Sequence, residues 1–254
     1  MTRFDLTGKK AIVTGAGRGI GKALAIGLAE AGAEVAVVAR TEADLQEVVQ
    51  EIQASGGAAA PITADLTEAG AAEKVVAETL ETLGGLHILV NNAGMNIRKK
   101  AHEVSEEEWD RVVDLNLKGA FFLSQAAGKV MCEQRYGRIV NIASVAGLVA
   151  LRTGVAYGAS KAGVIQMTRV LALEWSKFGV NVNAIAPWYF RTPLTEALLD
   201  DEAFLQEVLQ RTPSGRIGDV EDLVGPAIFL ASDAASYISG QTIAVDGGMS
   251  VYGF

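Results

Sequence analysis

Three polar residues in the middle of the chain have the types and spacing needed for proton transfer. Tyr157 follows Ser144 by 13 positions, and Lys161 follows Tyr157 by four. Residues at positions i and i+4 share one face of a helix, so the phenol and the ammonium point the same way. A free tyrosine has a pKa near ~10, too high for a base at neutral pH, but a nearby ammonium lowers it. The pattern predicts a proton-transferring tyrosine, a lysine that lowers its pKa, and a serine that binds the substrate oxygen.

The residues that most other catalytic mechanisms use are scarce. The 254 residues include two histidines, His87 and His102, and a single cysteine, Cys132. One cysteine cannot form an internal disulfide, and the sequence has no cluster of cysteines and histidines for zinc, so we expect no metal site. A hydrolytic triad needs a histidine beside its nucleophile. Proton transfer is therefore expected to rest on Tyr157.

A glycine-rich turn near the N-terminus predicts a phosphate-binding site. An apolar segment is followed by TGAGRGIG at 14–21 and then by a helical run at 22–30. Gly15, Gly19 and Gly21 allow a sharp turn and a close approach to a pyrophosphate, and the start of the helix presents free N–H groups to the phosphates. This order of strand, turn and helix is typical of a dinucleotide site. The turn also contains Arg18 and Ile20.

The end of the second predicted strand distinguishes between the nicotinamide cofactors. In this architecture, the acidic residue that binds the ribose 2′-hydroxyl of NAD stands about 20 positions after the glycines. Here the strand end reads VVART at 37–41, and Glu42 comes only where a helix begins. Arg40, together with Arg18, is placed to bind a 2′-phosphate, which guanidinium groups bind strongly. We predict that NADP(H) is preferred over NAD(H).

Short apolar runs alternate with helical segments along the whole chain. Residues at 72–83, for example, repeat at helical spacing. Strands buried on both faces and alternating with helices indicate an α/β fold, a doubly wound parallel sheet of about seven strands with helices on both faces. No linker or repeat divides the chain, so we expect a single domain over 1–254. The predicted strands lie at 11–14, 34–39, 58–63 (near a sheet edge, because it contains Pro61), 87–91, 138–142, 180–185 and 242–245.

A segment at about 187–218 interrupts this alternation. It contains Pro187, Pro193 and Pro213, and a short helical stretch at 194–209. A connection of this length in a compact domain is usually functional or disordered. It follows a strand end, where ligands bind in open parallel sheets. We therefore predict that this segment is a substrate lid.

The net charge of the chain indicates which kinds of binding partner to expect. Lys and Arg number 22 and Asp and Glu number 30, which gives a formal net charge of −8. An acidic chain is poorly suited to nucleic acids and to anionic membranes, both of which attract basic surfaces. No apolar run is long enough to span a bilayer, and residues 1–10 lack the apolar core of a signal peptide. We expect a soluble cytoplasmic protein with a small-molecule substrate and with no nucleic-acid or membrane partner.

Taken together, the motifs resemble the short-chain dehydrogenase/reductase family over about residues 5–250. The resemblance implies a Rossmann-type fold, oxidation of a CH–OH group with NAD(P) as acceptor, and a homotetramer. It implies that Tyr157 is the general acid/base, that Lys161 also binds the nicotinamide ribose, that Ser144 polarises the substrate oxygen, and that Asn116 helps to hold a proton-relay water. The motifs that carry it are Thr14–Gly21, Asn91–Gly94, Asn116, Ser144, Tyr157, Lys161 and Val245–Gly248.

The resemblance also extends the cofactor site beyond the glycine-rich turn. It implies that the adenine is contacted by Asp65 and Leu66, the ribose by Asn92, Ala93 and Gly94, and the nicotinamide carboxamide by Pro187, Phe190 and Thr192. The chain departs from the family at one position, because Pro-Gly is usual where this chain has Pro187 and Trp188. We expect the bulky ring of Trp188 to reshape the nicotinamide end of the pocket.

Several stretches are similar to family members that oxidise gluconate and related keto-deoxy sugar acids. They are NNAGMNIRKK at 91–100, APWYFRTP at 186–193 and TPSGRIG at 212–218. The carboxylate of a sugar acid needs a cationic partner, for which Arg98, Arg152 and Arg191 are candidates. The predicted reaction interconverts an alcohol and a ketone, such as gluconate and 5-ketogluconate. Two alternatives stay open: reduction of 3-oxoacyl thioesters, and a cofactor-binding protein without catalytic activity.

Overall fold

The computed structural model describes residues 3–252 of the chain. At its centre is a seven-stranded sheet in the order β3-β2-β1-β4-β5-β6-β7, in which every pairing is parallel. The predicted fold class and number of strands are confirmed, and the strand with Pro61 lies at the sheet edge as expected. The strands are β1 (Lys10–Thr14), β2 (Glu34–Ala39), β3 (Ala58–Thr63), β4 (Ile88–Asn91), β5 (Gly137–Ile142), β6 (Val180–Pro187) and β7 (Thr242–Val245).

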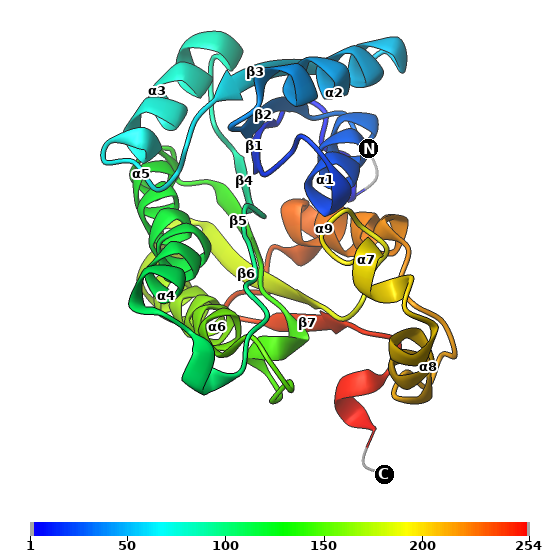
Figure 1. Cartoon of the computed structure of the whole chain (residues 1–254). Helices are drawn as coiled ribbons and strands as arrows, with labels where there is room; N and C mark the ends of the chain where they lie inside the picture. The colour runs from blue at the N-terminus through cyan, green and yellow to red at the C-terminus, as the bar shows by residue number, and fades with distance from the viewer. Residues whose placement is uncertain (1–2, 253–254) are drawn as a thin grey trace.

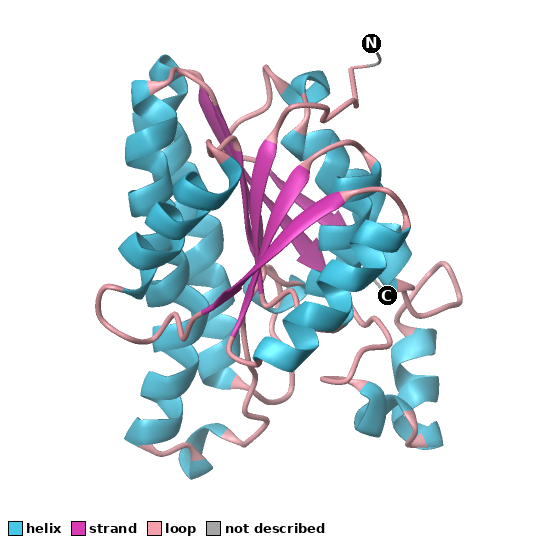
Figure 2. Cartoon of the chain, turned by 90° about the horizontal axis from the view of Figure 1, so that it is seen from above, coloured by secondary structure: helices cyan, strands magenta, loops and turns pink. Residues whose placement is uncertain are grey.

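Helices cover both faces of the sheet, as the two views in Figures 1 and 2 show. One face carries α1 (Gly19–Glu30), α2 (Glu42–Ala54) and α9 (Val224–Ala231). The opposite face carries α3 (Ala71–Leu83), α4 (Glu106–Val113), α5 (Ala120–Glu133) and α6 (Val155–Trp175). Short 3₁₀ turns lie at Ala101–Glu103, Val145–Gly147, Ser176–Phe178, Val220–Leu223, Asp233–Ala235 and Met249–Val251.

The strands supply two separate apolar cores, because successive residues of a strand point to opposite faces. In β1, Ala11 and Val13 pack in the core with residues of α1 and α2, whereas Ile12 packs with residues of α3 and α5. All three side chains are fully buried. A strand that is buried on both faces has no polar side to alternate with, which explains the unbroken apolar runs in the sequence.

The predicted elements differ from the structure mainly at their ends. Helix α1 begins at Gly19 instead of residue 22, inside the glycine-rich turn itself. Strand β6 continues past residue 185 to Pro187, which pairs with Val245 of β7. The helical stretch at 194–209 is two helices, α7 (Glu196–Leu199) and α8 (Glu202–Gln210). They are separate because the Asp201 carboxylate accepts hydrogen bonds from the first N–H groups of α8 and so starts a new helix.

The segment at 187–218 leaves the sheet and returns to the same place. Phe190 and Gly218 form an isolated parallel bridge, and the Gly218 N–H donates to the Tyr189 carbonyl at 2.8 Å. A Cβ on Gly218 would overlap the Phe190 ring, so only glycine fits at this position. Helices α7 and α8 therefore form one excursion beside the carboxyl end of the sheet (Figure 1). Within residues 3–252, no helix combines the length and apolar character needed to cross a membrane.

Candidate active site

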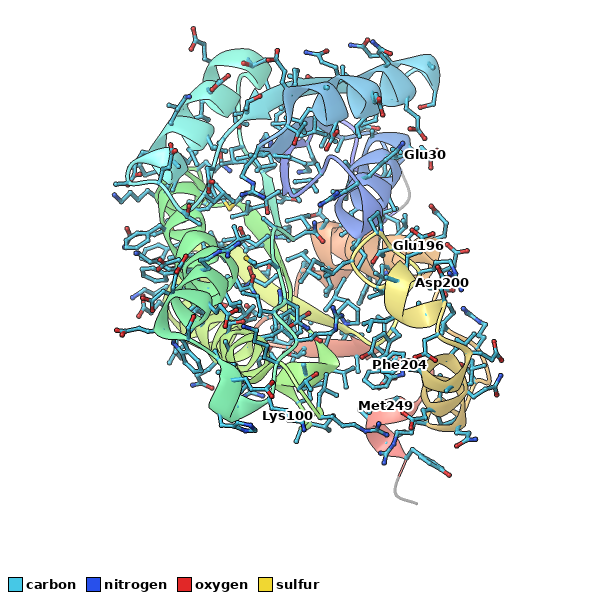
Figure 3. The ribbon with its side chains drawn as sticks, in the orientation of Figure 1. Glu30, Lys100, Glu196, Asp200, Phe204 and Met249 are labelled. Carbon is cyan, nitrogen blue, oxygen red and sulfur yellow. The ribbon has the colours of Figure 1, made fainter. Side chains whose placement is uncertain are left out.

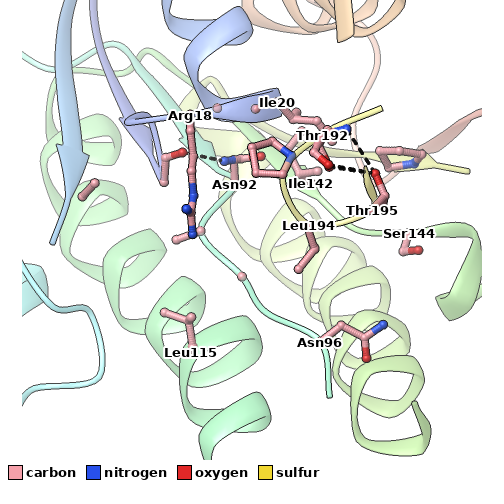
Figure 4. Close-up of a pocket in the computed structure, with 18 of the residues that line it drawn as sticks. Arg18, Ile20, Asn92, Asn96, Leu115, Ile142, Ser144, Thr192, Leu194 and Thr195 are labelled. Atoms are coloured by element: carbon pink, nitrogen blue, oxygen red, sulfur yellow. Dashed lines mark hydrogen bonds between the residues drawn. The ribbon is translucent and has the colours of Figure 1, made fainter. Parts of the chain in front are cut away.

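A cavity of about 430 Å³ opens at the carboxyl ends of the strands, beside the junction of β1 and β4. The chain order of the strands reverses at this junction, which is where open parallel sheets bind ligands. Figure 4 shows the cavity with part of its lining. The structure brings together along it all residues predicted to contact the cofactor: Gly15, Arg18, Gly19, Ile20, Gly21, Arg40, Asp65, Leu66, Asn92, Ala93, Gly94, Tyr157, Lys161, Pro187, Phe190 and Thr192.

The glycine-rich turn has the geometry of a phosphate cradle. Gly15 and Gly19 have positive φ angles of 64° and 55°, which residues with a Cβ rarely adopt. At Gly21 a Cβ would overlap the carbonyl oxygen of Gly15. The first turn of α1 has no acidic residue, and its N-cap, Arg18, makes no side-chain capping bond. The first turn of α1 therefore contributes free N–H groups and the helix dipole, with no acidic side chain of its own, as binding of a pyrophosphate requires.

Asn92 joins this turn to the end of β4. Its side-chain amide donates to the carbonyl oxygens of Thr14 at 2.9 Å and Gly15 at 3.3 Å. In return, the Thr14 hydroxyl accepts from the backbone N–H groups of Asn92 at 2.9 Å and Ala93 at 3.0 Å. The side chain of Asn92 therefore holds the turn to the end of β4, at the edge of the cavity that this residue also lines.

The end of the cavity predicted to bind the adenine contains both a guanidinium and carboxylates. The Arg40 side chain is 73% exposed, and its guanidinium lies 3.8 Å from the Asp65 carboxylate. A hydrogen bond from the Thr67 N–H holds the pKa of Asp65 below its ordinary value, and the Arg40 charge acts in the same direction. Asp44, in the first turn of α2, also lines the cavity and packs against Gly17. Asp44 was not predicted from the sequence, because only the fold of α2 brings it back over the turn.

At the opposite end, three predicted catalytic residues lie close together. Ser144 follows β5, and Tyr157 and Lys161 lie on one face of α6, as their spacing predicts. The Lys161 ammonium lies 5.7 Å from the centre of the Tyr157 ring and donates to the carbonyl of Ile142 at 2.7 Å. Ser144 and Lys161 are 8% and 4% exposed. The cavity is thus the main route by which a ligand can reach these groups.

Burial has the largest effect on the pKa of Tyr157. It raises the pKa of Tyr157, while the Ser144 hydroxyl and the Arg98 charge oppose this rise. Burial thus outweighs the neighbouring charges at this tyrosine, and the lowering of its pKa by Lys161 stays a prediction. Burial also lowers the pKa of Lys161 to about 8, because a desolvated ammonium is costly. Both groups are consequently driven toward their neutral forms.

Asn116 lies beside the cavity and does not line it. It belongs to a short π-helix, Asp114–Gly119, between α4 and α5, and is 1% exposed. Its amide oxygen accepts from the Met95 N–H at 2.8 Å, and its NH₂ donates to the Met95 carbonyl at 2.9 Å and to the Ser160 hydroxyl at 3.1 Å. With both ends of the amide used, the side chain fixes the loop after β4 against α6.

The three arginines predicted for a substrate carboxylate lie in different places. Arg98 is half-buried, lines the cavity with Ser144 and Tyr157, and pairs with no carboxylate among residues 3–252. Arg152 and Arg191 do not line it. They form ion pairs with Glu207 at 2.9 Å and Asp200 at 3.0 Å. Arg98 is therefore the cation of the three that is free to meet a ligand.

Other residues of this end were not assigned from the sequence. Asn96, Leu151 and Tyr189 line the cavity near Arg98. The amide oxygen of Asn96 is buried without a hydrogen-bond partner in the described part of the chain. Burial raises the pKa of Tyr189, and the Arg98 charge opposes this. A side chain in a loop gives no periodic signal, so only the folded chain shows that these residues converge.

Comparisons with known proteins define the class of protein. Residues 15–250 match a family model described as enoyl-(acyl carrier protein) reductase. The chain is 42% identical to a tropinone reductase homolog of Arabidopsis thaliana over 99% of this chain and 96% of that protein. It is 43% identical to the 2-dehydro-3-deoxy-D-gluconate 5-dehydrogenase of Escherichia coli K12 over 98% of both. The structure of gluconate 5-dehydrogenase from Burkholderia cenocepacia, in complex with NADP and tartrate, superposes with a TM-score of 0.95 at 39% identity and 98% coverage of both chains.

The chain therefore belongs to the short-chain dehydrogenase/reductase family. It is an oxidoreductase that acts on a CH–OH group with NAD(P), and its cavity carries the residues that this chemistry uses. Catalytic activity thus replaces the alternative of a cofactor-binding protein without turnover.

The close approach of Gly21 to Gly15 gives a first prediction. Gly21→Ala forces a methyl group against a backbone carbonyl that cannot move without opening the turn, so we expect lower thermal stability and the loss of most NADPH affinity. Melting temperature and NADPH fluorescence titration measure the two effects. The neighbouring Lys22→Ala removes only a surface ion pair with Glu51 and should leave both values close to wild type. Unchanged NADPH binding in Gly21→Ala would contradict the cradle.

The buried lysine predicts a pH-dependent stability. Its pKa in the folded chain, about 8, is below the ordinary value of 10.5. Between these values the unfolded chain binds a proton that the folded chain does not, so this group makes folding more favourable as pH rises through the window. Lys161→Met removes that contribution. Its free energy of unfolding relative to wild type should therefore fall from pH 7 to pH 10 in urea titrations. Lys177→Met, at an exposed lysine, serves as control, and a flat difference for Lys161→Met would refute the prediction.

Proposed function

We propose that the chain is an NADP-dependent oxidoreductase that interconverts the hydroxyl and keto forms of a sugar acid, such as gluconate and 5-ketogluconate. The observation that carries this proposal is the Arg98 guanidinium, which pairs with no carboxylate of residues 3–252 and lines the same cavity as Ser144 and Tyr157. A half-buried cation without a countercharge favours an anionic ligand. The names of the relatives support the substrate class, since one acts on a keto-deoxy-gluconate and another was solved with NADP and tartrate.

The residues of the site divide the chemistry among them. When bound, the nicotinamide exchanges a hydride with the substrate carbon. In reduction, the Tyr157 phenol donates its proton to the carbonyl oxygen, while the Ser144 hydroxyl donates a hydrogen bond to the same oxygen as negative charge develops. In oxidation, the Tyr157 phenolate takes the proton from the alcohol. Burial keeps Tyr157 protonated in the free protein, which suits reduction, and higher pH favours oxidation.

The remaining predicted residues have supporting roles in this proposal. Lys161 holds the nicotinamide ribose from the floor of the cavity, and Asn116 positions the loop after β4. The segment at 187–218 acts as the substrate lid of a single dinucleotide-binding domain. The homotetramer and the cytoplasmic location remain predictions from the sequence and the family resemblance.

A second candidate function is the reduction of a 3-oxoacyl thioester. It is favoured by the description of the matching family model, which names an enoyl-(acyl carrier protein) reductase and so an enzyme that also acts on an acyl thioester, although at its C=C bond. The two functions differ in the charge of the substrate, because the acyl part of a 3-oxoacyl thioester has no carboxylate for Arg98 to bind. Substrate charge is therefore the property that separates them.

A substrate screen with matched arginine variants tests the proposed function. We expect NADPH-dependent reduction of 5-ketogluconate and weaker activity on uncharged ketones and 3-oxoacyl thioesters. Arg98→Met should lower kcat/KM for the sugar acid by roughly 10–100-fold, through KM, because a charged hydrogen bond is lost. It should leave kcat/KM for an uncharged ketone close to wild type. Arg152→Met is the matched control, since its charge is already paired outside the cavity.

Tyr157→Phe separates binding from chemistry in the same assay. It should lower kcat by roughly 10²–10⁴-fold, as expected for loss of a general acid, and leave NADPH affinity largely intact.

Equal losses in Arg98→Met and Arg152→Met would refute the carboxylate site. Activity on thioesters with none on sugar acids would favour the second candidate.

The charges at the adenine end predict opposite effects on cofactor choice. Arg40→Ser should lower kcat/KM for NADP by about tenfold or more and change that for NAD little, because the 2′-phosphate loses a guanidinium partner. Asp44→Asn should raise kcat/KM for NADP, since it removes a negative charge from the lining of the same end. Steady-state kinetics with both cofactors measure the ratio. A wild-type enzyme that uses NAD better than NADP would contradict the preference.

A further inference from the structure

Trp188 is fixed from two sides at the point where the sheet meets the lid. Its backbone N–H donates to the Val245 carbonyl at 3.2 Å, which continues the pairing of β6 with β7. Its indole N–H donates to the Thr212 hydroxyl at 3.1 Å, just after the end of α8. The ring is thus the link between the last residues of β6 and the far end of the excursion.

Thr212 is a rigid acceptor for this hydrogen bond. It is 3% exposed, and its hydroxyl donates to the Val208 carbonyl in the last turn of α8 at 2.7 Å. The next residues are held to the end of β7, where the Ser214 N–H donates to the Gly247 carbonyl at 3.0 Å. A Cβ on Gly247 would lie 2.7 Å from the Thr212 methyl group. Thr212 is therefore packed between α8 and the turn after β7.

Two more rings continue from the indole toward the lid helix. The Trp188 and Tyr189 rings meet edge to face with their centres 4.6 Å apart, and Tyr189 meets Phe204 in the same way at 5.5 Å. Trp188 and Tyr189 line the cavity, while Phe204 does not and supports Tyr189 from α8, where Figure 3 labels it. Edge-to-face packing of this kind adds to the stability of aromatic clusters. The three rings form an aromatic wall (Trp188, Tyr189, Phe204) on the lid side of the cavity.

The aromatic wall borders the space that the substrate must occupy. The same space of about 430 Å³ is lined by the phosphate turn and by the catalytic residues, so a dinucleotide and a substrate must share it. Arg98, Trp188 and Tyr189 line the same space as Ser144 and Tyr157, so a substrate at the catalytic residues has the arginine and the aromatic wall as neighbours. The indole lines this space and is held by its hydrogen bond to Thr212, while the backbone bond to Val245 fixes the main chain that carries it. We expect an atom added to the substrate on this side to meet the ring.

We propose that Trp188, held by Thr212, is a specificity-determining residue that sets the upper size of the substrate. The inference rests on the proposed function, since it concerns the substrate subsite of the same cavity. It explains how one chain keeps a short sugar acid and rejects a longer acyl chain at the same catalytic residues. A wall that cannot yield discriminates by size more sharply than a flexible apolar pocket does.

The first test measures size selectivity in the assay with NADPH. A series of keto acids of increasing chain length is compared in the wild type, Trp188→Ala and Trp188→Phe, as the ratio of kcat/KM for the longest and the shortest compound. We expect Trp188→Ala to raise this ratio by about tenfold or more, and Trp188→Phe to raise it less. Trp109→Phe, on α4, is the control and should leave it unchanged. A ratio in Trp188→Ala equal to the wild-type value would overturn the proposal.

The second test requires no turnover. Hydrogen–deuterium exchange is followed in α8 (Glu202–Gln210), with α5 (Ala120–Glu133) as the internal reference. Trp188→Phe and Thr212→Val should each speed exchange in α8, and the double variant should add little, because both remove the same hydrogen bond. Unchanged exchange in α8, or fully additive effects, would show that Thr212 does not hold the indole and would overturn the proposal.

The two tests also separate this inference from the proposed function. If the wild type reduces keto acids but no sugar acid, the proposed substrate fails while the length ratio still measures the wall. If sugar acids are reduced and Trp188→Ala changes neither the ratio nor the exchange in α8, the substrate stands and the wall fails.

Discussion

The site depends on the hydrogen bonds between Thr14 and Asn92, which join the ends of β1 and β4. These strands are neighbours in the sheet but far apart in the sequence, and the helices that follow them lie on opposite faces. The Asn92 amide supports the phosphate turn from one side, while its backbone begins the loop that leads to Arg98. A small group of hydrogen bonds, centred on the buried Thr14 hydroxyl, therefore holds the phosphate turn against the end of β4. Removing a partner from a buried hydroxyl is costly.

The electrostatics of the catalytic end follow from burial. The buried lysine and the half-buried tyrosine both prefer their neutral forms, and this preference opposes the simple picture of an ammonium that ionises a phenol. The carbonyl of Ile142 compensates part of the desolvation of Lys161 by accepting its hydrogen bond. The pKa values of both groups thus depend on how far the site is exposed to solvent. A bound molecule that excludes water or adds charge changes both pKa values.

The features predictable from the sequence were those with a local physical cause. Strands buried on both faces leave unbroken apolar runs, the glycine turn needs positive φ at Gly15 and Gly19, and the pairing of Tyr157 with Lys161 follows from helical periodicity. The rest depends on contacts distant in the sequence. Asp44 reaches the cavity because α2 folds back over Gly17, and Tyr189 reaches it because Trp188 and Phe204 hold its ring. Likewise, the amide of Asn116 is taken up by Met95 and Ser160, which no pattern around residue 116 reveals.

The bridge between Phe190 and Gly218 has a consequence for how the fold can diversify. The bridge joins the two stems of the excursion at its base, so the segment leaves and rejoins the sheet at the same place whatever its length or sequence. Lengthening a loop whose ends are already fixed costs little additional entropy. The length and sequence of the segment between the two stems can therefore change while the pairing of β6 with β7 stays the same.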